Sequence, residues 1–159
     1  MNPSVPAAFE TRLQRLAVDI VVSRTPMDDA VVLAEDLLAA GFEGDATVEV
    51  AVLRRDVTYG DAGPLVRAML AEYGIELPIP GDEEAEYRLL LRTFGLWKLP
   101  IGDFYAPFLH QLPPWDKQDS LERALMELFV RLDNASVPAQ ADEVVERMRA
   151  TVRAALQAD

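Results

Sequence analysis

Apolar residues recur along most of the chain at steps of three and four, the spacing of one face of an α-helix. The first such stripe lies within residues 5–23 and is carried by Phe9, Leu13, Leu16 and Ile20. Further stripes run through residues 27–38, 65–73, 87–97, 121–132 and 145–155. The pattern predicts an all-α fold, arranged as an irregular bundle of six to eight short helices.

Residues typical of helix ends separate the first stripes. Thr25 is a predicted N-cap, and Pro26 follows it at the first helical position. Gly41 is predicted to end that helix in the left-handed conformation. Asp61 is predicted to begin the helix that Gly74 ends. Each apolar stripe is therefore expected to be a separate helix.

The second half of the chain carries similar signals. Residues 82–86 are rich in acids, which favour the positive end of a helix dipole. Asp116 or Asp119 is expected to cap a later helix, and Asp119 has capping-box spacing to Glu122. A last helix is predicted to follow Pro138.

Residues 46–53 are ambiguous. Val48, Val50 and Val52 alternate as they would in a strand, whereas Val50 and Leu53 also fit one side of a helix. A lone strand needs a partner, and the neighbouring sequence offers no second strand pattern. We predict a helix here and keep the strand as the alternative.

The length of 159 residues predicts a single domain, residues 1–159, with a full hydrophobic core. The connector at residues 75–82 has the sequence IELPIPGD. Its two prolines and its glycine make it the best position for a subdivision into two halves.

The net charge of the chain limits the classes of partner that we expect it to bind. The chain has 27 acids against 15 bases, a net charge of −12. This argues against binding nucleic acid, which needs basic residues at the phosphates, and against an anionic membrane surface. No apolar run approaches the roughly 20 residues of a membrane helix, and the N-terminus lacks a secretory pattern. We therefore expect a cytoplasmic protein, whose charge serves solubility or attracts a basic protein partner.

The sequence offers little catalytic chemistry. It has no cysteine and one histidine, so thiolate sites and multi-histidine zinc sites are excluded. Neither acidic cluster, in residues 28–36 or in residues 82–86, has calcium-loop spacing, and there is no glycine-rich phosphate motif. His110 could share a helix face with Asp103, but no nucleophile motif accompanies them. We predict no catalytic residue, no metal and no cofactor, and lean against an enzyme.

Residues 94–115 are the most distinctive segment. They hold six of the twelve aromatic residues, both tryptophans and the only histidine. These side chains either fill the core where helices meet or form a binding surface. In an intermediate arrangement, Phe104 and Phe108 are buried and other residues line a groove. The candidate binding residues are Trp97, Asp103, Tyr105, His110 and Trp115.

Two stretches carry a family resemblance. Residues 36–77 include Leu-Leu-Ala-Ala-Gly and Leu-Val-Arg-Ala-Met-Leu, and residues 100–108 contain the pattern Pro-x-Gly-x-x-Tyr. They resemble a group of small, acidic, helical proteins of high-GC bacteria. A high-GC source also fits a chain with thirteen arginines, two lysines and 22 alanines. The resemblance implies an all-α fold and brings no activity or site residue.

Three functional hypotheses follow. The first is a non-enzymatic protein-interaction domain with an acidic surface and a basic protein partner, for which an immunity or antitoxin role is one specific form. The alternative is a small-molecule-binding protein or enzyme with a pocket lined by residues 94–115. The third is a subunit whose aromatic patch forms a homodimer.

Overall fold

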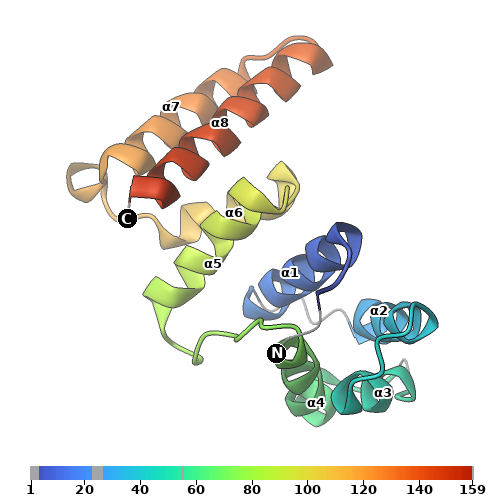
Figure 1. Cartoon of the computed structure of the whole chain (residues 1–159). Helices are drawn as coiled ribbons and strands as arrows, with labels where there is room; N and C mark the ends of the chain where they lie inside the picture. Colours follow the sequence, from blue (N-terminus) through green and yellow to red (C-terminus); the bar gives the residue numbers. More distant parts are fainter. Residues whose placement is uncertain (1–3, 23–26, 55, 159) are drawn as a thin grey trace. The chain divides into compact units, whose positions relative to one another are not determined.

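The computed structural model describes residues 4–22, 27–54 and 56–158, apart from the side chain of Tyr59. Within these residues the chain forms eight α-helices and one 3-10 helix, without a strand (Figure 1). The predicted all-α fold of short helices is therefore confirmed. None of the described helices combines the length and the apolar character needed to cross a membrane.

The chain divides into two compact units, residues 1–82 and residues 83–159. The boundary falls at the end of the proline- and glycine-rich connector, where the sequence placed its best candidate for a subdivision. Each unit has its own apolar core. The prediction of a single domain stays a prediction.

The first unit contains α1 (Ala7–Val21), α2 (Met27–Ala39), α3 (Asp45–Ala51) and α4 (Tyr59–Glu72). Successive helices in this unit pack against one another. The core consists largely of the predicted stripes and includes Leu13, Leu16, Val31, Leu37, Val50, Val66, Met69 and Leu70. Residues 45–51 are helical, so the helix prediction for the ambiguous segment is correct and the strand alternative is wrong.

Two glycines end helices of this unit as predicted. Gly41 has φ +92°, and Gly74 has φ +80°, a conformation that a residue with a Cβ rarely adopts. At the first of them, the Phe42 N–H donates to the carbonyl of Leu37 and the Gly41 N–H to that of Leu38. This is the Schellman arrangement of hydrogen bonds. The predicted cap at Thr25 and Pro26 lies outside the described residues.

The start of α4 differs from the prediction. The helix begins at Tyr59 rather than Asp61, and its N-cap is Thr58. The Asp61 N–H donates to Thr58 Oγ1, and that hydroxyl donates in turn to the Asp61 carboxylate at 2.8 Å. Asp61 is therefore the third helical residue and strengthens a cap that threonine provides.

The second unit contains α5 (Glu83–Leu96), α6 (Ile101–Gln111), the 3-10 helix η1 (Trp115–Lys117), α7 (Ser120–Asp133) and α8 (Pro138–Ala158). Helices α7 and α8 run side by side, and α5 packs against both α6 and α8 (Figure 1). Asp119 caps α7 in a full capping box with Glu122. Of the two predicted caps, Asp119 is therefore correct, because Asp116 lies in η1.

Candidate functional site

The aromatic segment supplies most of the core of the second unit. Phe94, Phe104 and Phe108 are fully buried. The Phe94 and Phe104 ring centroids lie 4.0 Å apart, and those of Phe104 and Phe108 lie 5.1 Å apart. Phe129 of α7 packs against this row from the side. The phenylalanines of residues 94–115 are thus structural.

The five candidate binding residues lie at different places around this core. Trp115 is 60% exposed, and Tyr105 is 38% exposed with its edge against Phe129. His110 is exposed, whereas Trp97 and Asp103 are half-buried. Phe104 and Phe108 are therefore buried while Tyr105, His110 and Trp115 reach solvent. The groove of the intermediate arrangement stays a prediction.

Three of these candidates share α6 but do not converge. Asp103 and His110 are seven residues apart, which places them on the same side of α6 with about 10 Å between their backbones along the axis. Tyr105 lies roughly 140° around the helix from His110. Pro107 lies in the middle of α6 and supplies no N–H to the helix. A common binding role for the five residues remains a prediction.

The exposed ring of Trp115 contacts a charged guanidinium. The guanidinium of Arg123 lies 5.7 Å from the Trp115 ring centroid, and its Nη2 donates to the Trp115 carbonyl at 3.4 Å. Cation–π contacts at exposed sites contribute only about 0.5–1 kcal/mol. Trp115 is thus an exposed ring in contact with a guanidinium.

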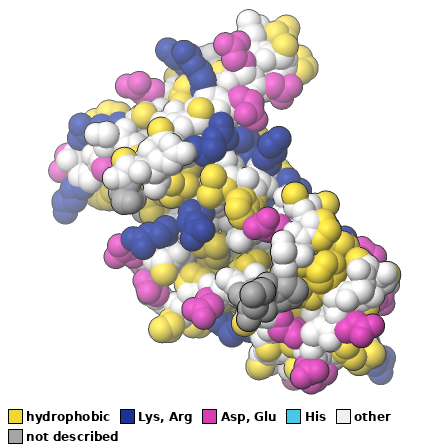
Figure 2. Space-filling model, in the orientation of Figure 1, with side chains coloured by type: hydrophobic (Ala, Val, Ile, Leu, Met, Phe, Trp, Pro, Cys, Tyr) yellow, Lys and Arg dark blue, Asp and Glu magenta, His cyan; other side chains and the backbone are white. Residues whose placement is uncertain are grey.

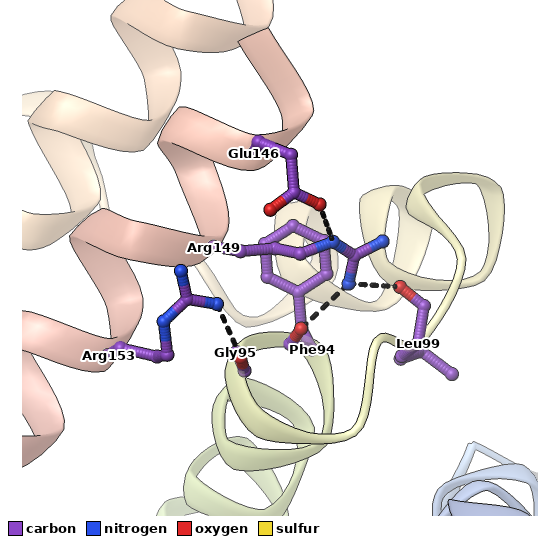
Figure 3. A network of polar contacts seen from close by, with 6 residues as sticks. All are labelled: Phe94, Gly95, Leu99, Glu146, Arg149 and Arg153. Carbon is purple, nitrogen blue, oxygen red and sulfur yellow. Dashed lines mark hydrogen bonds and ion pairs between the residues drawn. The ribbon is translucent and has the colours of Figure 1, made fainter. Parts of the chain in front are cut away.

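Arg149 of α8 is a buried charge, with an exposure of 7%. Its Nη1 donates to the carbonyls of Phe94 at 2.8 Å and Leu99 at 3.0 Å (Figure 3). Its guanidinium lies 4.5 Å from the centroid of the Phe94 ring. Glu146 pairs with Nε of Arg149 at 3.5 Å. These contacts satisfy a charge that would otherwise be costly to bury.

A second arginine of α8 completes the same arrangement. Arg153 Nη1 donates to the carbonyl of Gly95 at 3.1 Å (Figure 3). The last turn of α5 carries no basic residue of its own. Two guanidiniums from α8 therefore cover carbonyls at the negative end of the α5 dipole. A Cβ on Gly95 would lie 3.0 Å from Val152, so glycine allows α8 to approach closely.

The buried side chains of Thr93 and Glu122 are also hydrogen-bonded, whereas the buried Nε1 of Trp97 has no hydrogen-bond partner among the described residues. Thr93 donates to the Leu89 carbonyl, and Glu122 belongs to the capping box. Tyr87 donates to Glu122 at 3.5 Å. Burial raises the pKa of Tyr87, and the nearby carboxylates of Glu122 and Asp119 raise it further. The Tyr87–Glu122 hydrogen bond joins α5 to α7, whereas the Thr93 bond and the capping box each belong to a single helix. No described group of acids and histidine is arranged to hold a metal ion.

The first unit has a different surface. Its 82 residues carry 14 acids and six bases, and the segment from 27 to 53 carries no base at all. Over this part of the molecule, acidic and hydrophobic side chains predominate, whereas basic ones gather over the second unit (Figure 2). All acids of the segment are exposed: Asp28, Asp29, Glu35, Asp36, Glu43, Asp45 and Glu49. We call these seven carboxylates, with Val48 and Val52, the acidic α2–α3 surface.

Two valines of α3 give this surface an apolar component. Val52 is 77% exposed and Val48 is 42% exposed. Together with Asp45 and Glu49 they occupy the side of α3 opposite the buried Val50. β-Branched residues on an exposed helical turn add little to helix stability. Because Val48 and Val52 are exposed, packing within the unit does not account for them either.

A polar network holds α3 in place. The Glu72 carboxylate of α4 accepts the Thr47 N–H at 2.8 Å and the Thr47 hydroxyl at 3.0 Å. The same hydroxyl hydrogen-bonds to Tyr73 at 2.8 Å. The carboxylate thus lies at the positive end of the α3 dipole, and a Cβ on Gly44 would collide with it. These hydrogen bonds therefore hold the first turn of α3 against the end of α4.

One cavity that the structure describes lies in the first unit, and none of its lining residues belongs to residues 94–115. It has a volume of about 210 Å³ and lies between α1 and α2. From the sequence we predicted a pocket lined by residues 94–115 and none between α1 and α2. The only sequence feature at this cavity is a set of charged residues beside the apolar stripe of α1.

No protein-family model, curated protein or solved structure matches this chain. The likeness to acidic helical proteins of high-GC bacteria stays a prediction.

Proposed function

We propose that this protein is a non-enzymatic interaction domain whose acidic α2–α3 surface binds a basic protein. One observation carries the proposal: a continuous segment of two helices exposes seven carboxylates and two valines without a single basic residue. Of the seven carboxylates, Asp36 pairs with Arg12 of α1. The remaining excess of negative charge steers a partner of the opposite sign and suppresses wrong partners.

The exposed valines supply what charge alone does not. Electrostatic attraction raises association rates, but specific complexes also need an apolar centre that excludes water. Val48 lies between Asp45 and Glu49 in the sequence of α3, and Val52 is the C-cap residue of this short helix. The fitting partner is therefore a protein surface with basic residues around an apolar patch.

The buried groups support a non-enzymatic role. Arg149, Glu122 and Thr47 each serve to join helices, and the histidine is exposed to solvent. General acids and bases are more often found in clefts with perturbed surroundings. An immunity or antitoxin protein that masks a basic toxin is one form that this proposal can take.

A capture experiment with matched charge tests the proposal. The test variant carries Glu35→Gln, Glu43→Gln and Glu49→Gln, none of them at a helix N-terminus. The control variant carries three neutral substitutions of exposed acids in the second unit: Glu127→Gln, Asp133→Asn and Glu143→Gln. Both variants lose three negative charges, so non-specific attraction is reduced equally.

Wild-type and control proteins should retain the same basic protein from a lysate of the source organism, and the test variant should lose it. The interaction should weaken when salt is raised, because exposed charges are screened. Equal loss in both variants, or retention of only a second copy of this chain, would contradict the proposal.

A further inference from the structure

The cavity between α1 and α2 is built from one side of each helix. Helix α1 contributes Arg12, Arg15, Leu16 and Asp19, and α2 contributes Asp29, Val32 and Leu33. Both sets follow helical spacings of three and four. The walls are therefore formed by regular helix surfaces.

Charges of both signs line this cavity. Arg12 is oriented by Asp36, whose carboxylate lies 2.8 Å from Nη1. A guanidinium has five N–H donors, so this ion pair leaves others for a second carboxylate. Asp19 and Asp29 offer carboxylate oxygens to a cationic group. A ligand that carries both charges would find partners for each.

The floor of the cavity is aliphatic. Leu16 and Leu33 are almost completely buried, with exposures of 4% and 2%. Val32 is half-buried beside them. A small aliphatic group entering from solvent would be removed from water against these side chains. An entirely polar ligand would gain nothing from this floor.

The volume limits the size of the ligand. A cavity of about 210 Å³ corresponds to roughly seven water molecules at about 30 Å³ each. That space suits a molecule of about nine non-hydrogen atoms and is too small for a nucleotide. The two aspartates also oppose a phosphate, which carries negative charge without a compensating cation.

We propose that this cavity binds a free α-amino acid with a branched aliphatic side chain. Arg12 and Arg15 take the carboxylate, Asp19 and Asp29 take the ammonium group, and the aliphatic floor takes the side chain. This site shares two residues with the acidic α2–α3 surface: Asp29 lines the cavity, and Asp36 pairs with its Arg12.

Ligand-observed NMR with leucine and three partial analogues tests the site. 4-Methylpentanoate lacks the ammonium group, isopentylamine lacks the carboxylate, and glycine lacks the aliphatic chain. Leucine should bind at least about tenfold more tightly than each analogue, since each analogue loses one of the three contacts. An analogue that binds as well as leucine, or no leucine binding at about 10 mM, would overturn the proposal.

Variants locate the binding. Arg15→Gln and Asp29→Asn should each weaken leucine binding by about tenfold or more. Arg67→Gln and Asp28→Asn alter the same types of residue outside the cavity lining and should leave binding unchanged. Val32→Phe fills the cavity while keeping all four lining charges, and it should abolish binding in a protein that is still helical by circular dichroism. Full binding by Val32→Phe would show that leucine binds elsewhere and would overturn the assignment.

Discussion

At the residue scale, the second unit depends on one arginine. Arg149 satisfies two carbonyls and lies over a phenylalanine ring, so it links α8 to the end of α5. In the sequence, Arg149 is one of three arginines within residues 147–153 of the last predicted helix. Spacing along α8 could not reveal which guanidinium turns inward, because its acceptors lie 50 and 55 residues earlier in the chain.

Arg149→Met should therefore lower the free energy of unfolding by about 3 kcal/mol, since two buried carbonyls lose their donor. Arg147→Met is the control, because Arg147 is exposed on the same helix, and it should change the value by less than about 0.5 kcal/mol. Urea unfolding followed by circular dichroism measures both. Similar values for the two variants would show that Arg149 is not the link described.

Tyr87 provides a prediction about pH. Burial raises the pKa of its hydroxyl above the ordinary value of 10.0. The folded protein therefore keeps this proton at pH values where the unfolded chain loses it. The stabilisation is complete below pH 10 and is lost as pH rises above 10 towards the folded pKa.

Tyr87→Phe should consequently reduce the fall in unfolding free energy between about pH 9 and pH 11. Burial also raises the pKa of Tyr73. Tyr73→Phe should therefore remove a separate part of the fall in unfolding free energy, the part that arises in the first unit. Denaturant unfolding at several pH values measures both slopes. An unchanged slope in Tyr87→Phe would contradict the account of its surroundings.

At the scale of elements, local signals predicted helices better than their starts. The period of the apolar stripes identified the helices, and the glycines after α2 and α4 ended them where expected. The start of α4 was misplaced by two residues because Thr58 and Asp61 are both good caps, and the hydrogen bonds between them are visible only in three dimensions. The exposed valines that made α3 ambiguous are also the residues that distinguish its surface.

The capping box of α7 was predictable from sequence and can be tested directly. Asp119→Ala should lower the free energy of unfolding by about 1 kcal/mol, because the Glu122 N–H loses its acceptor. Asp116→Ala, three residues earlier in η1, should have little effect. If the two substitutions cost the same, the cap would not act as described.

At the scale of the whole molecule, the candidate site was the least predictable feature. Aromatic density drew attention to residues 94–115, yet Phe94, Phe104 and Phe108 are core. From the sequence, the acidic α2–α3 surface was visible only as an acidic cluster at residues 28–36 and as part of the net charge. Its significance depends on which carboxylates are exposed and which valines are left uncovered, and both depend on packing.

The division into two units leads to a prediction about proteolysis. Residues 79–82 are exposed, and Ile79 is 75% exposed. Limited digestion with proteinase K should cleave this connector before any helix, because exposed loop residues enter a protease most readily. Mass spectrometry of the first fragments identifies the site. Initial cleavage within α2 or α8 would contradict the division.

The central claim is that the acidic α2–α3 surface binds a basic protein. The most direct test places a photo-crosslinking amino acid at Val52, which is 77% exposed, and in a separate protein at Val130, which is 58% exposed in the second unit. In cells of the source organism, the probe at Val52 should crosslink to one protein through a basic segment, and Glu49→Lys should abolish that product. The same product from Val130, or an unchanged yield with Glu49→Lys, would contradict the claim.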